Sequence, residues 1–245
     1  MHRRLHHCTL FWAMSLAVVL AALPALADPL VVWSFTGLPA QPATSENTPP
    51  SNPILPAAEA NPSTGLTTTD LTHVGLVYST AVAPGGVGTS IPGELNIKNF
   101  DVGGDGNDNF LTYTLTADPG NVIDIDSMSV FLWRNGGGAP DGIAFDVSVD
   151  GGPFELYGDV QVASTTGGGV YDPFIFNHSI TGAQSIDVRF APRHVSAGST
   201  GNLHILAMGV DGSVRVVPEP TAAVLLLLGV TALWRRDRRS LFASR

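Results

Sequence analysis

The chain has 245 residues, 44% of them hydrophobic, and a formal net charge of −9. Seven of its twelve basic residues lie at positions 3, 4 and 235–245, so that the segment 28–220 holds twenty acidic against five basic residues. This strongly negative segment repels nucleic-acid phosphates and anionic membrane surfaces, which excludes nucleic-acid binding. The single cysteine is Cys8, so neither disulfides nor thiolate metal ligands are expected after it.

The N-terminus has the features of a secretory signal peptide. Arg3 and Arg4 precede an apolar segment at 10–23, and Ala25-Leu26-Ala27 has the small-x-small form that signal peptidase accepts. An uncleaved transmembrane helix is the alternative, but an apolar run of this length falls short of the roughly 20 residues that cross a bilayer. Residues 1–27 are therefore predicted to be a cleaved signal peptide.

Residues 28–70 are predicted to form one strand and a long loop or linker. The segment 30–35 (LVVWSF) is strand-like, whereas 36–70 is dominated by Pro, Thr, Ser, Asn and Ala without helical or strand periodicity. Such a composition buries too little apolar area to offset the entropy of ordering it, so a plain spacer is expected.

Residues 71–216 are predicted to form an antiparallel β-sandwich. The segments FLTYTLTA, IAFDVSVD and SIDVRF each alternate apolar with polar residues, which gives every strand one apolar face and one wettable face. Two sheets that close their apolar faces on each other satisfy this pattern. Asp150-Gly151-Gly152 predicts a tight hairpin turn, and further strand candidates bring the total to about nine or ten.

An acidic, glycine-rich segment precedes the strand that begins at Phe110. Residues 103–111 (GGDGNDNFL) match one copy of the glycine-aspartate nonapeptide of calcium-binding β-rolls, in which carboxylate oxygens suit a hard cation. An ordinary turn is the alternative, because Gly, Asn and Asp are also turn residues and the repeat normally works by stacking. The candidate calcium ligands are Asp101, Asp105, Asn107 and Asp108.

The sequence contains no recognisable catalytic motif, and no catalytic residue is predicted. The histidines after residue 27 occur singly, and neither HExxH nor GxSxG is present. A pair of glycosidase carboxylates cannot be selected among the many aspartates, because their separation depends on the fold. An enzyme that degrades polysaccharide is thus the least favoured class of function.

Two tryptophans, Trp33 and Trp133, lie between the predicted terminal signals. Trp133 is followed by Arg134, Asn135 and three glycines, which suggests a loop platform where a sugar ring could stack beside polar partners. Trp33 lies in an apolar strand. The alternative interpretation is that both rings belong to the core.

The C-terminal 29 residues contain three consecutive features: Pro218-Glu219-Pro220, an apolar run at 221–234, and arginines beginning at Arg235 and Arg236. In order and spacing these features resemble the PEP-CTERM sorting signal of exported bacterial proteins, here spanning 217–239. The resemblance implies that an exosortase recognises the triplet and cleaves near it, while the arginines stay on the cytoplasmic side. The apolar run, about 21 Å as a helix, is short for a core of roughly 30 Å, so only transient anchoring in the inner membrane is expected.

The central segment resembles the jelly-roll domains that often precede such tails, notably in DNFLTYTLTADPG and in GNLHILAMGVDGSV. This likeness implies a β-sandwich without implying catalysis. The favoured hypothesis is a non-enzymatic secreted or cell-surface protein, structural or adhesive, associated with the extracellular polysaccharide matrix. The alternative is a carbohydrate-binding module that grips matrix glycan through Trp133 and the adjacent loops.

Overall fold

The computed structural model describes residues 28–38, 49–78, 93–98, 109–135, 139–162, 172–193 and 201–217. These residues form two antiparallel sheets, which confirms the predicted β-sandwich. The strands of the first sheet are β10 (Asp172–Ala183), β7 (Asn121–Asn135), β12 (Asn202–Val216), β1 (Asp28–Ser34), β5 (Leu95–Lys98) and β4 (Val77–Tyr78). The central strands are β7 and β12, and both β1 and β5 pair with the edge of β12 that faces away from β7.

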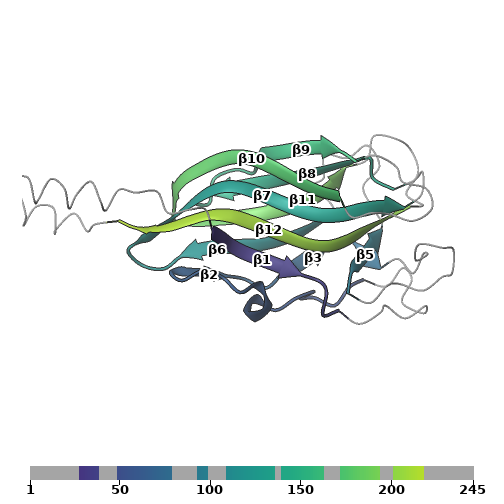
Figure 1. Cartoon of the computed structure of the whole chain (residues 1–245), viewed down its shortest axis with the longest axis horizontal. Helices are drawn as coiled ribbons and strands as arrows, with labels where there is room; N and C mark the ends of the chain where they lie inside the picture. The colour runs from purple at the N-terminus through teal and green to yellow at the C-terminus, as the bar shows by residue number, and fades with distance from the viewer. Residues whose placement is uncertain are drawn as a thin grey trace, which may run out of the picture.

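The second sheet packs on the first, and Figure 1 shows the long strands of both running along the length of the molecule. Its strands are β2 (Leu66–Thr68), β6 (Phe110–Ala117), β11 (Ser185–Arg193), β8 (Gly142–Val149), β9 (Glu155–Gln161) and β3 (Thr72–Val74). Their order in the sheet is β2, β6, β11, β8, β9, and β3 also pairs with β6.

The alternating segments place their side chains as predicted. In β6, Leu111, Tyr113 and Leu115 are fully buried in the core, whereas the threonines between them lie on the other face. The same alternation puts Phe145 of β8 and Phe190 of β11 into the core, where their ring centroids lie 5.4 Å apart. Because successive side chains of a strand point to opposite faces, every second residue of these strands faces the core and the residues between them face away from it.

Trp33 and Tyr113 join the two sheets at the centre of the core. Their rings meet edge to face with centroids 5.7 Å apart, and both side chains are buried. The Trp33 Nε1 and the Tyr113 hydroxyl have no hydrogen-bond partner within the described residues. Burial raises the pKa of Tyr113 above its ordinary value, so this hydroxyl remains neutral.

The described part of 28–70 belongs to the sandwich, so the prediction of a plain spacer is wrong for residues 49–70. A 3-10 helix, η2 (Ala57–Ala60), and β2 lie in this stretch, and the backbones of Leu55 and Leu71 form an isolated antiparallel bridge. Ile54, Leu55 and Leu66 are buried in the core. These few apolar residues attach the segment to the sandwich, although its overall composition is typical of a linker. The described sandwich thus runs from β1 to β12 and is longer than the predicted 71–216.

The described chain begins and ends at the same end of the sandwich, here called the tail end. Asp28 lies opposite Gly212 of β12, and the Val217 amide donates to the carbonyl of Gly120 in the turn between β6 and β7. The predicted hairpin turn is also here, with Asp150 and Gly151 at positive φ. The opposite or far end is marked by the strand ends at Asn135, Gly142, Arg193 and Asn202.

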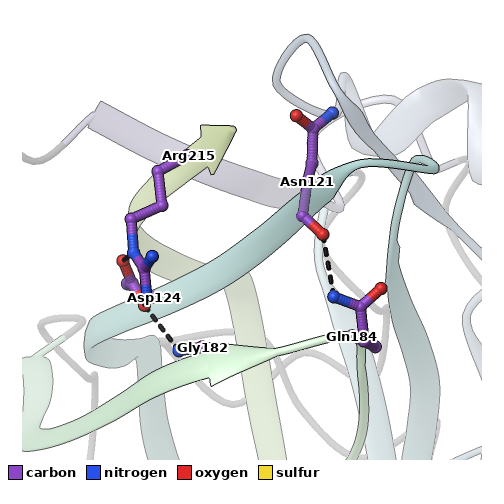
Figure 2. A network of polar contacts seen from close by, with 5 residues as sticks. All are labelled: Asn121, Asp124, Gly182, Gln184 and Arg215. Atoms are coloured by element: carbon purple, nitrogen blue, oxygen red, sulfur yellow. Dashed lines mark hydrogen bonds and ion pairs between the residues drawn. The ribbon is translucent and has the colours of Figure 1, made fainter. Parts of the chain in front are cut away.

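A polar network fastens three strands of the first sheet at the tail end (Figure 2). The Asp124 carboxylate accepts from the Gly182 amide at 2.6 Å and from the Arg215 Nε at 2.6 Å. Gly182 has a φ of +76°, a conformation that favours glycine, where β10 shifts its register against β7. The Gln184 side chain adds a bond to the Asn121 carbonyl.

Replacing Asp124 with alanine is expected to lower the free energy of unfolding by about 1.5–3 kcal/mol, because a backbone amide loses a charged acceptor. Arg215→Gln is the matched control: this side chain is 54% exposed, and its loss should cost less than about 1 kcal/mol. Chemical denaturation of both variants measures the difference. Equal losses would mean that the ion pair, and not the Gly182 contact, fastens this end.

Candidate functional site

Trp133 lies on β7 and is only 3% exposed. The prediction of an exposed loop platform at this residue is therefore wrong. The core alternative holds for Trp33, which packs in the hydrophobic core, but Trp133 is buried outside that core. Its ring instead stacks on His204 of β12, with centroids 3.8 Å apart and planes 11° from parallel.

The register of three strands explains why Trp133 faces away from the core. Trp133 pairs with His204, and His204 pairs with Asn96 of β5. The next residues along these strands, among them Leu132, Leu203 and Ile97, belong to the core. Because side chains alternate along a strand, Trp133 and its two partners lie on the face of the first sheet opposite the core, here called the outer face.

A chain of hydrogen bonds joins the polar residues beneath Trp133. Glu94 Oε1 lies 2.6 Å from His204 Nδ1, Asn202 Nδ2 lies 2.8 Å from His204 Nε2, and the same amide lies 2.6 Å from Asn96 Oδ1. In this assignment His204 is neutral: Nδ1–H donates to the carboxylate and Nε2 accepts from Asn202. These four polar residues and Trp133 are called the buried polar cluster.

Burying the polar groups of this cluster costs free energy when the chain folds. His204 is 0% and Glu94 1% exposed, and a carboxylate taken out of water destabilises the fold unless hydrogen bonds compensate for the lost hydration. The Trp133 Nε1 has no hydrogen-bond partner within the described part of the chain. A sandwich needs only an ordinary wettable outer face for stability, so this arrangement has to be explained by something other than core packing.

Arg134 and Asn135 do not join Trp133 in one binding surface. Arg134 is buried and its Nη1 donates to the Val162 carbonyl at 2.8 Å, which ties β7 to the end of β9. Asn135 is half-buried and pairs with Asn202. The predicted platform fails because Trp133 is buried and because a strand sends the side chain of its neighbour Arg134 to the opposite face; Asn135 lies on the same face as Trp133.

An exposed apolar strip continues the outer face from the buried polar cluster toward the tail end. Phe131, two residues from Trp133 on the same face, is 40% exposed, and Ile175 of β10 is 61% exposed. Gly209 adds no side chain at the centre of the strip. There is little room for one, because a Cβ there would lie 3.1 Å from the Ser129 hydroxyl oxygen. We call it the Phe131 strip; cross-strand pairing assigns to it Val32, Ser34, Ser129, Phe131, Pro173, Ile175, Ala207 and Gly209.

The other predicted sites fall outside the described residues and stay predictions. They are the calcium ligands Asp101, Asp105, Asn107 and Asp108 and the sorting residues Pro218, Glu219, Pro220, Arg235 and Arg236, together with the signal peptide 1–27. Within the described ranges, no three His, Cys, Asp or Glu side chains gather closely enough to hold a metal ion. None of the helices among those residues has the length and apolarity to span a bilayer.

Sequence reasoning missed Glu94, Asn96, Asn202 and His204. A weak signal exists: in the short segments ELNIK (94–98) and NLHI (202–205), polar and apolar residues alternate. Alternation alone predicts a solvated face for them. That they meet depends on the pairing of β5 with β12, more than 100 residues apart in sequence.

No protein-family model matches the chain, and no curated protein matches it in sequence. Among solved structures it is similar to the CBM22-1 xylan-binding domain of Paenibacillus barcinonensis Xyn10C, with 14% identity over 80% of this chain and 98% of that one, and a TM-score of 0.36. It is also similar to a Podospora anserina GH26-CBM35 β-(1,4)-mannanase, with 15% identity and a TM-score of 0.34. That match covers 64% of this chain and 29% of the mannanase chain. At these scores neither ligand nor activity is transferred to this chain.

Proposed function

We propose that this protein is a non-catalytic, exported β-sandwich that associates with extracellular polysaccharide through the Phe131 strip. The observation that carries the proposal is the exposed Phe131 ring on the outer face, directly beside the buried polar cluster. An aromatic ring offers a flat apolar surface to the C–H face of a sugar, and the serines of the strip can bond sugar hydroxyls. The buried polar cluster acts as a rigid support for the β7 segment that presents Phe131.

The shape of the Phe131 strip suits an extended ligand. The strip crosses β1, β12, β7 and β10, which spans about 14 Å at the usual spacing between strands. Its members are mostly small or flat, and Gly209 adds no side chain at the centre. A sugar chain laid across the strands could contact Phe131 and Ile175 together.

The charge of the Phe131 strip favours a neutral polysaccharide. None of its eight residues is charged. Toward the tail end, the first charged residue beyond the strip on β12 is Asp211, whose carboxylate accepts a hydrogen bond from the Ser127 hydroxyl at 3.1 Å. An anionic chain would approach this carboxylate without gaining an ion pair within the strip. Neutral glycans avoid that repulsion.

The expected sorting of the chain agrees with this use of the outer face. A signal peptide and a PEP-CTERM-like tail would export the protein to the cell surface or the extracellular matrix, with signal peptidase and exosortase as processing partners. The described chain begins and ends at the tail end, so a tether there leaves the outer face accessible. The proposed location does not depend on whether the mature protein is finally released.

Replacing Phe131 with alanine is expected to weaken binding to neutral polysaccharide about tenfold or more, since ring stacking and apolar contact are lost together. The full chain, purified in mild detergent because of its apolar ends, is tested by affinity electrophoresis against xylan, mannan and glucan. Leu156→Ala is the matched control, because this apolar side chain is 49% exposed but lies outside the strip.

Absence of binding to every neutral glycan would contradict the proposal and favour a purely structural role. An equal effect of Phe131→Ala and Leu156→Ala would show that the strip is not the contact surface. Release of reducing sugars from any of these polysaccharides would contradict the non-catalytic assignment.

A further inference from the structure

Arg189 lies on the outer face of the second sheet, opposite the Phe131 strip across the core. Its guanidinium carbon is 3.5 Å from the centroid of the Phe154 ring and 4.5 Å from that of the Phe110 ring. The three residues come from different places in the sequence: β11, the turn before β9, and the start of β6. Two aromatic rings therefore hold one cationic group.

The charge of Arg189 is not neutralised by an ion pair within the described residues. The cross-strand neighbour of Arg189 is Asp146, but both oxygens of that carboxylate accept from the Arg193 Nη2, at 3.0 and 3.3 Å. The nearby Asp187 carboxylate accepts from the Thr114 hydroxyl at 2.6 Å. Each carboxylate thus has a hydrogen-bond donor of its own, and the Arg189 guanidinium has only ring contacts there.

Stacking prepares a guanidinium for a planar anion. Rings that contact its face restrict its rotation and leave the N–H groups at its edge free to donate. A carboxylate matches these donors with two parallel hydrogen bonds, and a fixed guanidinium loses less entropy on binding than a free one. The exposed part of Phe154 adds an apolar surface beside the same edge.

We infer that Arg189, held by Phe110 and Phe154, binds the carboxylate of a uronic-acid residue in an acidic polysaccharide. One carboxylate per sugar fits a single unpaired cation, and the sugar ring can contact Phe154. A ligand with more charge per unit length, such as a polysulfated glycan or an acidic peptide, would be repelled more strongly by Asp187, whose carboxylate on the same face is bonded to the neutral Thr114 hydroxyl. This site is independent of the neutral-glycan surface, since the two outer faces point away from each other.

The test uses the full chain and polygalacturonate, with the fully methyl-esterified polymer as the neutral probe. Arg189→Gln is expected to weaken polygalacturonate binding about tenfold to a hundredfold, because a charge-assisted pair is lost. Arg189→Lys should recover little of the loss, since an ammonium lacks the planar donors. Arg215→Gln, which removes one charge from a 54% exposed site, should leave binding unchanged.

Three outcomes would overturn the inference. Arg189→Gln and Arg215→Gln could weaken polygalacturonate binding equally, or the methyl-esterified polymer could bind as tightly as polygalacturonate. Poly-glutamate could also bind as tightly as polygalacturonate, which would point to a protein partner. Neutral-glycan binding and the melting temperature of Arg189→Gln verify that the variant is folded. Because Arg189→Gln leaves the Phe131 strip intact, failure of this site and failure of the proposed function are distinguishable.

Discussion

Trp33→Ala is expected to lower the free energy of unfolding by about 3–5 kcal/mol, the largest loss of any single truncation proposed for this chain. Trp33 is 0% exposed on β1 and packs edge to face on Tyr113 of the opposite sheet. Alanine would leave a cavity at the contact between the sheets, and backbone pairing with β12 would limit how far the site can collapse. Urea unfolding followed by far-ultraviolet circular dichroism measures the loss.

Tyr113→Phe provides the control for this prediction. The Tyr113 hydroxyl is buried without a hydrogen-bond partner in the described part of the chain, so removing it keeps the ring contact and deletes an uncompensated polar group. The variant should be as stable as the parent or more stable by about 1 kcal/mol. A large loss in Tyr113→Phe would contradict the environment described for this hydroxyl.

Glu94→Ala is expected to cost about 2–4 kcal/mol, because it leaves a cavity and removes the acceptor of a buried imidazole N–H. Glu94→Gln should cost only about 1 kcal/mol, since its amide oxygen can still accept from His204 Nδ1. Glu155→Ala, on the exposed edge strand β9, should change stability by less than about 0.5 kcal/mol.

The contrast between the two Glu94 variants tests the protonation state assigned to His204. If His204 were a buried cation, Glu94→Gln would leave that charge unpaired and would be nearly as damaging as Glu94→Ala. Similar losses in the two variants would therefore contradict a neutral His204 that donates from Nδ1 and accepts at Nε2. Equilibrium unfolding near neutral pH distinguishes the two results.

The fold could be predicted because its main signal is local. Alternation in β6, β8 and β11 fixes which side chains are buried, and the glycine turn after β8 fixes one hairpin. The segment 49–70 has the average composition of a linker, and an average hides the few apolar residues that are buried. Four buried apolar residues, Ile54, Leu55, Ala60 and Leu66, and a β-bridge attach it to the sandwich, although prolines and threonines surround them.

The candidate site was harder to predict because it depends on register. The residues around Trp133 in the sequence are typical of a loop and predict an exposed ring, whereas Trp133 lies buried within β7 and stacks on His204. The partnership of Glu94 with His204, and that of Arg189 with two phenylalanines, joins strands distant in the sequence. Neither composition nor spacing carries that information.

The most direct test of the proposed glycan surface is hydroxyl-radical footprinting of the full chain with and without a neutral polysaccharide that it binds. The account predicts that the ligand protects Phe131 and Ile175 from oxidation, while Phe154 and Leu156 on the other side of the sandwich react as before. Protection of Phe154 and Leu156 with Phe131 and Ile175 unchanged would contradict the assignment of the Phe131 strip as the binding surface.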